Sequence, residues 1–473
     1  MMEEILSETT KETSISAYSE KVKAQRSFFR SGKTLDHSFR KDQLTRLKSG
    51  LKKYEAQFVK ALFDDLHKPE MEAYATELDV SVEEINHVIE NLAFWMDPEP
   101  VSTPLFFQPG RSMTIYEPHG VAVIIAPWNY PIKNLIGPLI GAMCAGNTAV
   151  VKPSEISPAT SKVMAQMIAD IFSPEYITCI EGGVAETTEL LKERFDYLLF
   201  TGGTEIGRII YQAAAKNLTP VTLELGGKSP TVVDERVNLK IAAKRIVWGK
   251  FLNTGQTCIA PDHIYVHNSR KAEFIELVKK YISQFWPDGQ SSKDLGRIIS
   301  DRHFERLSKM IDGDVVIGGK TDAKARYISP TVIDNVRPDH PAMQQEIFGP
   351  IMPVIGFDSI DEVIENINNG EKPLALYVFT KSSKTKKRFV HSTSSGVILF
   401  NDLIVHAGHA GLPFGGIGNS GIGAYNGKIG FETFSHKKPV MYRSFLGDVA
   451  QKYPPYTKGK LGFIRFAIKW LLG

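Results

Sequence analysis

Short apolar segments alternate with longer segments of helical periodicity from residue 120 to about residue 400, and this pattern strongly constrains the fold. The alternation predicts parallel strands joined by helices that cover both faces of a sheet. Ligands bind such sheets at the carboxyl ends of the strands, where Lys152, Gly202 and Glu224 fall. The first expected unit has strands at 121–126, 147–152, 197–200 and 220–224, and helices at 133–145, 158–171 and 205–216.

A second alternating unit begins with an expected strand at 230–233, a helix at 239–252 and a strand at 264–266. Residues 17–94 carry apolar side chains at helical spacing among many charges, which predicts amphipathic helices with little chemistry of their own. Residues 97–118 change to prolines and an extended run, which predicts a β-hairpin that leaves the domain. At 473 residues the chain is longer than one core normally supports, so two or three subdomains are expected.

The bulk composition is that of an ordinary soluble protein. Hydrophobic residues make up 42% and charged residues 23%, and the net charge of +3 gives no basic surface of the kind that binds nucleic acid. The three cysteines, Cys144, Cys179 and Cys258, are too sparse for a disulfide framework and suit a reducing compartment, and no Cys/His cluster indicates a metal. The polar N-terminus has no apolar signal core, so a cytoplasmic location is expected.

Two glycine-containing stretches present a thiol and a carboxylate. Cys258 follows Gly-Gln-Thr, and a nucleophilic cysteine needs such a turn or helix end, where its thiolate is stabilised and reachable. The alternative is an inert buried thiol, which suits the other two cysteines better. Glu224 ends an apolar strand before Gly-Gly, where burial raises a carboxyl pKa toward the range of a general base. Its alternative is a structural glutamate bonded to the following backbone.

Polar residues also follow the first two expected strands. Asn129 lies between aromatic and proline residues, where its amide could donate to a developing oxyanion or simply form a turn. Lys152 and Glu155 could bind a ribose. They could also belong to a capping box that opens the next helix, with Ser154 or Ser157 as the cap.

Residues 200–207 read FTGGTEIG, a strand, a glycine turn and the start of a helix. Such a turn can offer backbone N–H groups to a diphosphate, although its glycine spacing differs from the G-x-G-x-x-G fingerprint. A plain strand-to-helix turn is the alternative. Glu346 and Phe348, before a Gly-Pro turn, are uninformative by themselves.

Taken in order, these stretches resemble the successive motifs of the aldehyde dehydrogenase superfamily. The motifs PWNYP, KPSE, FTGGTEIG, LELGGKSP, GQTCIAPDH and EIFGP span most of residues 120–350, and PFGGIGNSGIGAYNGKIGFETFSHKK extends the match past residue 430. The wording LTPVTLELGGKSP and GQTCIAPDH is most similar to the class 3 or fatty aldehyde dehydrogenase branch. Gly203, where many relatives have a polar residue, is a minor departure.

The resemblance implies NAD(P)-dependent oxidation of an aldehyde, medium- or long-chain fatty or aromatic, to the carboxylic acid. Cys258 would form a thiohemiacetal and then a thioester, Asn129 with the Cys258 N–H would hold the oxyanion, and Glu224 would activate water. An acid at position 155 favours NAD over NADP, although members of the branch often accept both. The implied cofactor contacts are Trp128, Lys152, Pro153, Ser154, Glu155, Gly202, Gly203, Thr204, Glu205, Ile206, Gly207, Leu225, Gly226, Glu346 and Phe348.

The fold that the resemblance implies is α/β, with a Rossmann-type cofactor domain, an α/β catalytic domain and a small bridging β element. Members of the branch are commonly homodimers, and an isolated hairpin is marginal without a partner. The expected ranges are 1–97 and 119–226 for the NAD(P)-binding domain, 227–396 for the catalytic domain, 98–118 and 397–445 for the bridging element, and 446–473 for a C-terminal tail.

The end of the tail, residues 461–473, reads LGFIRFAIKWLLG, which predicts an amphipathic helix with Arg465 and Lys469 on a narrow polar stripe. Such a helix extends only about 20 Å, too short to cross roughly 30 Å of hydrocarbon. Residues 459–473 could instead lie on a membrane surface, as suits an enzyme of fatty aldehydes. The alternative is a helix that docks on its own or a neighbouring subunit.

Two rival functions follow from the same residues. An acylating relative would pass the thioester to coenzyme A, but Glu224 argues against it, because a thiol acceptor needs no water-activating base. A non-catalytic protein on the same fold is the second rival, and it has no use for Cys258, Glu224 and Asn129 together. Aliphatic, aromatic and apocarotenoid aldehydes all remain open as substrates.

Overall fold

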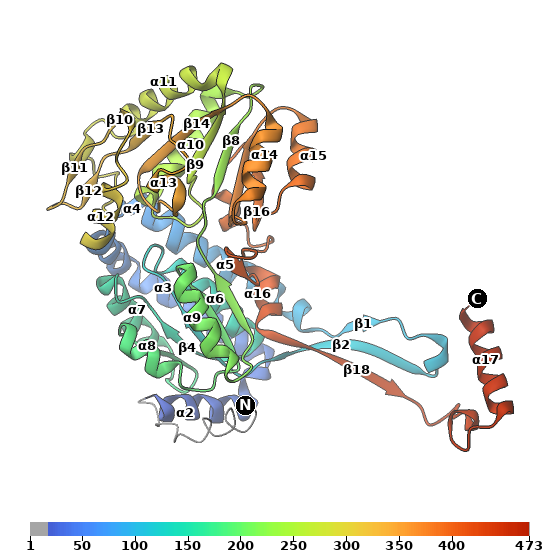
Figure 1. Ribbon diagram of the computed structural model, residues 1–473. Helices are drawn as coiled ribbons and strands as arrows, with labels where there is room; N and C mark the ends of the chain where they lie inside the picture. The colour runs from blue at the N-terminus through green and yellow to red at the C-terminus, as the bar shows by residue number, and fades with distance from the viewer. Residues whose placement is uncertain (1–17, 473) are drawn as a thin grey trace, which may run out of the picture.

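Two mostly parallel sheets, each covered by helices, form the body of the computed structural model, which describes residues 18–472 (Figure 1). The parts of the expected N-terminal domain and tail at 1–17 and 473 lie outside the described residues. The sheets and their helices confirm the expected α/β fold class. A narrow three-stranded arm leaves the side of the body, and the C-terminal helix lies at the far end of this arm (Figure 1).

The first sheet has six strands in the order β17-β7-β6-β3-β4-β5, and only β17 runs antiparallel to its neighbour. Its side chains alternate between two cores. Ile124 packs with α3, α5, α6 and α7, whereas Val123 packs with α2, α8 and α9. The elements are β3 Val121–Ile125, β4 Thr148–Lys152, β5 Ile177–Cys179, β6 Tyr197–Thr201, β7 Val221–Glu224, β17 Gly421–Ile422, α2 Ser19–Arg30, α6 Lys133–Ala145, α7 Pro158–Ile171, α8 Val184–Leu190 and α9 Thr204–Ala215.

The N-terminal residues add a helical layer to this sheet. The long helix α3 (His37–Leu66) and α5 (Asp79–Met96) pack against each other and against α6. Between them lie a short helix α4 (Glu70–Ala73) and a π-helical turn η3 (Tyr74–Leu78). Single π-helical turns occur often at functional sites, so this junction is a place to look for side chains that serve the cleft.

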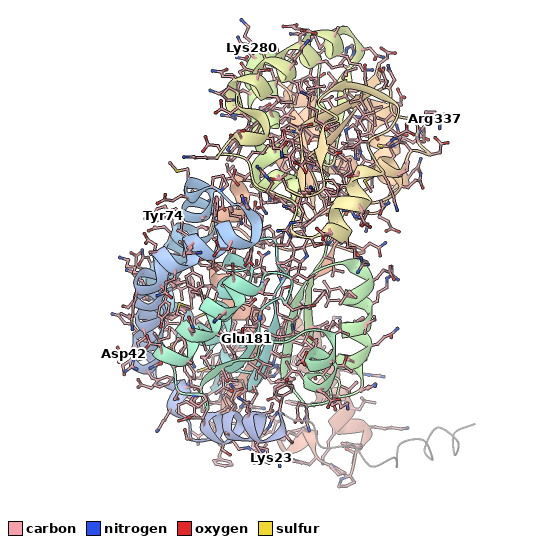
Figure 2. The ribbon with its side chains drawn as sticks, turned by 90° about the vertical axis from the view of Figure 1, so that its left-hand side faces the viewer. Lys23, Asp42, Tyr74, Glu181, Lys280 and Arg337 are labelled. Carbon is pink, nitrogen blue, oxygen red and sulfur yellow. The ribbon has the colours of Figure 1, made fainter. Side chains whose placement is uncertain are left out.

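The second sheet has seven strands in the order β10-β13-β14-β9-β8-β15-β16, with β10 antiparallel at one edge. Helices α10 and α11 cover one face, and α14 and α15 cover the other. Figure 2 shows Lys280 of α11 and Arg337 on the outer surface of this unit. The elements are β8 Pro230–Val233, β9 His263–His267, β10 Asp314–Ile317, β13 Thr331–Asp334, β14 Ile351–Phe357, β15 Ala375–Phe379, β16 Val397–Phe400, α10 Leu239–Phe251, α11 Asn268–Phe285, α12 Asp301–Ser308, α13 Pro341–Gln344, α14 Ile360–Asn369 and α15 Ser383–Ser392.

The arm is a sheet of β1 (Glu99–Val101), β2 (Gly110–Pro118) and β18 (Ser435–Arg443). The expected range of the second part of the bridging element, 397–445, includes strands that belong to the other two sheets. Its first four residues form β16, which pairs with β15 in the seven-stranded sheet, and β17 pairs with β7 in the six-stranded sheet. The connection between helix α15 and the apolar strand at 397 is short, so this strand returns to the parallel sheet. Of the residues 397–445, only those of β18 belong to the arm sheet.

Helix α17 (Lys458–Leu472) stands beyond the arm and away from the body (Figure 1). Leu461, Phe463, Phe466 and Trp470 on this helix are exposed, and Phe466 and Trp470 are 69% and 75% accessible. Within residues 18–472, none of the helices is both long and apolar enough to cross a bilayer. Because these side chains are exposed and the helix stands away from the body, it does not dock on its own subunit.

Candidate active site

A cleft of about 870 Å³ opens between the two sheets and gathers most of the predicted site residues. It lies at the carboxyl ends of β6 and β7, where the strand order predicts a ligand site. Side chains of the second unit complete its wall. Of the predicted residues, the cleft is lined by Trp128, Asn129, Gly202, Gly203, Thr204, Glu205, Ile206, Glu224, Leu225, Gly226, Cys258, Glu346 and Phe348.

A strained turn after α10 delivers Cys258 to this cleft. Asn253, Thr254 and Gly255 all have positive φ, of 50°, 56° and 73°. For residues with a Cβ this conformation costs roughly 1–2 kcal/mol each, so the surroundings must hold it. A Cβ on Gly255 would lie 2.3 Å from the Gly349 carbonyl oxygen, and the turn therefore requires glycine there.

The thiol of Cys258 is held neutral at rest. Burial raises its pKa to about 12, and the nearby Glu346 and Glu224 carboxyl groups raise it further. The residue itself is only partly buried, so its sulfur remains reachable from the cleft. Cys144 and Cys179 also have raised pKa values from burial, and neither lines the cleft, which fits the inert role expected for them.

Glu224 is a carboxyl group without a partner. It ends β7, its side chain is 2% exposed, and neither carboxyl oxygen has a hydrogen-bond partner in the described protein. Burial alone raises its pKa well above the ordinary value. A buried polar group that no protein atom satisfies marks a place that a ligand or reacting water can complete.

Asn129 follows β3 and is 3% exposed. Its Nδ2 donates one hydrogen bond to the Gln256 carbonyl oxygen at 3.1 Å, which ties the amide to the residues just before Cys258. An amide nitrogen carries two protons, so one donor of Asn129 is left for an oxygen in the cleft. This geometry is suited to an oxyanion that forms next to the sulfur.

The residues at the start of α9 fit the diphosphate of a dinucleotide. Gly203 has no atom within 4 Å of the place its Cβ would occupy, and no side chain caps the N-terminus of this helix. The buried hydroxyl of Thr201, just before the turn, has no hydrogen-bond partner. Free N–H groups at the start of a twelve-residue helix, open to a cleft, form a natural anion site.

Glu346 and Phe348 line the cleft from the loop between α13 and β14. Burial raises the pKa of Glu346 to about 8. Arg306 donates to the backbone carbonyls of residues 346 and 347 at 3.1 and 2.7 Å, which fixes the course of this loop. The Phe348 ring packs edge-on against Trp128 at 5.4 Å, so the two predicted cofactor contacts form one aromatic wall.

Five predicted cofactor residues do not line the cleft: Lys152, Pro153, Ser154, Glu155 and Gly207. Lys152 is buried at the end of β4, donates to the Pro153 carbonyl at 3.1 Å and lies 3.5 Å from a Glu155 carboxyl oxygen. Gly207 serves packing, because a Cβ there would lie 2.6 Å from Leu225.

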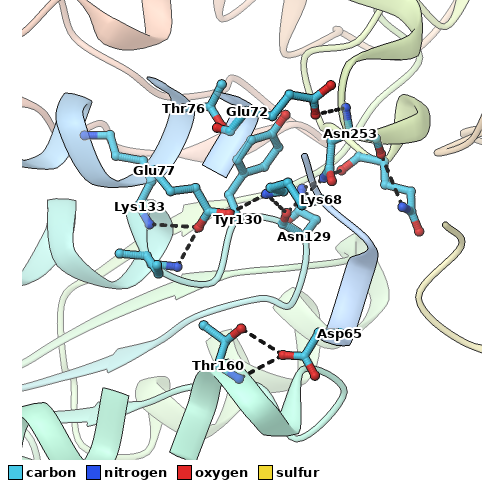
Figure 3. A network of polar contacts seen from close by, with 12 residues as sticks. Asp65, Lys68, Glu72, Thr76, Glu77, Asn129, Tyr130, Lys133, Thr160 and Asn253 are labelled. Carbon is cyan, nitrogen blue, oxygen red and sulfur yellow. Dashed lines mark hydrogen bonds and ion pairs between the residues drawn. The ribbon is translucent and has the colours of Figure 1, made fainter. Parts of the chain in front are cut away.

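The capping alternative for this segment is wrong in one respect, the residue that caps α7. The Ser154 hydroxyl accepts from the Ile156 N–H, and Ser157 donates to the Ser154 carbonyl, so neither caps α7. Asp65 of α3 accepts from the Ala159 and Thr160 N–H groups instead (Figure 3).

Sequence reasoning missed several charged residues that hold the cleft together. Lys228 pairs with Asp262 and donates to the carbonyls of Ala342 and Gln345 at 2.7 and 3.1 Å. Lys228 is part of the LELGGKSP stretch, and its position next to Gly-Gly was a usable signal. Arg306 sits in an ordinary helical pattern and gave none.

The sequence profile of the aldehyde dehydrogenase family matches residues 3–440. The chain belongs to that family. It is 44% identical to the 4,4'-diaponeurosporen-aldehyde dehydrogenase of Staphylococcus aureus, over 94% of this chain and 97% of the relative. It is 46% identical to the dimeric NADP-preferring aldehyde dehydrogenase of Canis lupus familiaris, over 93% and 98%. It is also 42% identical to aldehyde dehydrogenase family 3 member A2 of Mus musculus, over 93% and 92%.

Solved structures agree with this assignment. The substrate-bound state of Staphylococcus aureus AldH aligns with a TM-score of 0.92 at 43% identity, and covers 95% of this chain and 99% of that chain. The NAD+ complex of aldehyde dehydrogenase from Bacillus cereus aligns with a TM-score of 0.81 at 27% identity, over 89% and 88%. The resemblance stated from the motifs is confirmed, and the protein catalyses NAD(P)-dependent oxidation of an aldehyde to the carboxylic acid.

The raised pKa of Cys258 predicts how the ligand-free aldehyde dehydrogenase reacts with iodoacetamide. Because the thiolate is the nucleophile, the alkylation rate of Cys258 should rise about tenfold per pH unit through neutral and mildly alkaline pH, without a plateau. Peptide mass spectrometry identifies the alkylated cysteine, and Cys258→Ser supplies the background. A plateau near neutral pH would mean that the thiol is already ionised at rest.

Proposed function

We propose that Cys258, Glu224 and Asn129 carry out the reaction, and that its substrates are apolar aldehydes of medium or long chain or with aromatic groups. The observation that carries this proposal is that all three residues line one cleft, with the Glu224 carboxyl left unpartnered beside it. A structural glutamate would be expected to satisfy its oxygens within the protein.

In the proposed mechanism, Cys258 Sγ attacks the carbonyl carbon as its proton passes to water in the cleft, and the new C–S bond gives a thiohemiacetal oxyanion. Asn129 and the Cys258 N–H donate hydrogen bonds to this oxygen. A bound nicotinamide would supply the hydride acceptor, and loss of the hydride from the carbon would leave a thioester on Cys258. Glu224 then takes a proton from a water that attacks the thioester carbon, and the C–S bond breaks to release the acid.

The raised pKa values of the thiol and the carboxyl suit this sequence of steps. A thiol that stays protonated in the dry cleft resists oxidation until a substrate arrives. A Glu224 carboxyl whose pKa lies above its ordinary value is a stronger base once it ionises, which favours proton transfer from water.

Glu224→Gln should separate the two halves of the reaction. The thioester should form and release about one equivalent of NADH, while steady-state turnover falls roughly 10²–10⁴-fold because no base activates water. Intact-protein mass spectrometry should find the acyl group, and Cys258→Ala should abolish both the burst and the adduct.

The same experiment tests the acylating rival. Addition of coenzyme A should leave the rate of acyl release from the native enzyme unchanged. Faster release with coenzyme A, together with normal turnover of Glu224→Gln in its presence, would favour the acylating function over hydrolysis.

For the substrate, the name of one relative supports an aldehyde with an extended apolar chain. The Staphylococcus aureus protein is named for an aldehyde of 4,4'-diaponeurosporene, and this chain is 44% identical to it. Phe414 also lines the cleft and adds an aromatic surface to that of Trp128 and Phe348. Aldehydes with extended apolar chains, apocarotenoid ones included, therefore fit the proposal better than short polar aldehydes.

For the cofactor, we propose that NAD is preferred and NADP is accepted. Glu155 is 44% exposed at the end of the sheet, where its carboxylate would hydrogen-bond a ribose hydroxyl and repel a 2′-phosphate. Lys152 lies 3.5 Å from that carboxylate and offsets part of its charge, which supports some use of NADP.

Glu155→Gln should shift the enzyme toward NADP. Removal of the negative charge should raise the ratio of kcat/KM for NADP to that for NAD by about tenfold, because one charge–phosphate repulsion is lost at a partly exposed site. Glu189→Gln is the matched control, since Glu189 is 40% exposed and also pairs with a lysine three residues away. An equal change in both variants would point to general surface charge instead.

For assembly, we propose a homodimer formed through the arm. Strand β18 is an edge strand of nine residues, and β1 forms the opposite edge, so both edges of the arm are open in the single chain. An arm of three strands away from the body buries little of its own surface, and open edges of this kind invite pairing with another chain. One relative carries the word dimeric in its name, which is consistent with the proposal.

For location, we propose a cytoplasmic enzyme whose residues 459–473 contact a membrane surface. The apolar side chains of α17 are uncovered in the single chain, and Lys458, Lys460 and Lys469 add positive charge near them. A helix at the end of an arm can reach a bilayer while the cleft stays in solution (Figure 1).

Deletion of residues 459–473 should reduce co-sedimentation with anionic vesicles and lower the turnover of long-chain aldehydes more than that of short ones. The double variant Phe466→Asp and Trp470→Asp should do the same without shortening the chain, because two exposed apolar contacts are lost. Val390→Asp, an exposed apolar residue on the body, is the control. If the deletion changes the oligomeric state and leaves vesicle binding intact, the helix docks on a partner subunit instead.

A further inference from the structure

A buried ion pair lies directly behind the loop that carries Asn129 (Figure 3). Lys68, between α3 and α4, pairs with Glu77 of the π-helical turn η3, and both side chains are 0% exposed. The pair belongs to the helical layer, which also reaches the turn before Cys258, because Glu72 of α4 accepts a hydrogen bond from the Asn253 N–H at 2.9 Å. Neither residue lines the cleft.

The two charges hold the Asn129 loop at both ends. Lys68 Nζ donates to the Asn129 carbonyl oxygen at 3.1 Å and lies 4.1 Å from the centre of the Tyr130 ring. The second carboxyl oxygen of Glu77 accepts from the Ile132 N–H at 2.8 Å. The backbone on both sides of the Asn129–Tyr130 segment is therefore fixed by one ion pair.

The same loop is joined to the cysteine turn. Asn253, the first left-handed residue of that turn, donates to the Asn129 carbonyl at 2.9 Å, so this oxygen accepts from both Lys68 and Asn253. The Tyr130 hydroxyl lies 2.8 Å from the Thr257 hydroxyl, one residue before Cys258. Asn253 and Thr257 thus hold the loop from the side of the cysteine turn, through bonds that do not involve Lys68.

Stability alone gives a weak reason for such a pair. Two charges without exposure pay a large desolvation penalty, and a well-packed apolar pair of similar volume is often as stable or more stable. What the charges supply here is direction, because each bonds a defined backbone atom next to Asn129. Groups that support a reacting side chain in this way set its geometry to a fraction of an ångström.

We propose that Lys68 and Glu77 are positioning residues that aim the Asn129 amide at the oxyanion. The inference rests on the proposed role of Asn129. Lys68 and Glu77 touch neither substrate nor cofactor, and they act through the backbone of residues 129–132. Their loss should therefore affect the steps in which negative charge develops on oxygen, and spare cofactor binding and the intrinsic reactivity of the sulfur.

The test compares Lys68→Met with Lys133→Met. Lys133 is the matched control, since its side chain forms a buried ion pair with Glu84 in the same layer but bonds no atom of the Asn129 loop. Lys68→Met should lower kcat about 10- to 100-fold, because a small misplacement of an oxyanion donor has effects of this size. The KM for NAD and the rate of Cys258 alkylation by iodoacetamide should change less than about threefold, since alkylation forms no oxyanion. Lys133→Met should keep kcat within about threefold.

A double-mutant cycle with Asn129→Ala makes the inference independent of folding effects. If Lys68 acts through Asn129, Lys68→Met should cost little further activity once the amide is gone. The charge-free double variant Lys68→Met and Glu77→Gln, which avoids an unpaired buried charge, should show the same loss of kcat and the same lack of effect in the Asn129→Ala background.

The outcomes separate this inference from the proposed function. If Asn129→Ala retains full activity, the oxyanion role of Asn129 fails and the positioning role fails with it. If Asn129→Ala is impaired but Lys68→Met is not, or if Lys68→Met lowers kcat by its full factor in the Asn129→Ala background, only the positioning role is overturned. A parallel fall in alkylation rate and NAD affinity would likewise assign Lys68 a merely structural role.

Discussion

Desolvation at the meeting point of the two sheets governs the ionisable groups of this aldehyde dehydrogenase. Burial raises the pKa of both the Cys258 thiol and the Glu224 carboxyl, so the charged form of each group is disfavoured in the resting cleft. The parallel sheets make this possible, because their strands are buried on both faces and expose only their carboxyl ends to the cleft. In such an environment a single well-aimed hydrogen bond to an oxyanion is worth more than it would be in water.

The same desolvation requires that the reacting side chains be placed precisely. The turn before Cys258 carries left-handed residues at Asn253 and Thr254. Backbone of this kind persists only when neighbours over-determine it. Here the neighbours are hydrogen bonds to Asn129 and Gln256 and the close approach of Gly255 to Gly349. The nucleophile and the oxyanion amide are thus parts of one polar network.

The sequence was sufficient to predict the parts of this site that depend on local pattern. β4, β6 and β7 are apolar runs, and their ends predicted a site at Lys152, Gly202 and Glu224, of which Gly202 and Glu224 line the cleft and Lys152 does not. Contacts across long sequence separations could not be predicted in this way. Residues 17–94 gave only helical periodicity, which marks Lys68 and Glu77 as charges on an amphipathic helix, whereas the fold buries both beside a loop some sixty residues later. The contact of Asp65 of α3 with the start of α7 and the place of β16 in the second sheet are further examples.

Those long-range contacts also explain why the helical layer is more than a cover for the first sheet. Its apolar residues would exclude water from the sheet without any charge, as Leu47 and Leu62 do. The π-helical turn η3 places Glu77 one step out of the regular helical register, at a position from which one carboxylate reaches both Lys68 and the backbone of Ile132. A regular helix at this junction would keep the cover and lose that reach. The irregular turn, the ion pair and the Asn129 loop are therefore best understood as one structural unit, built to hold an amide where charge appears.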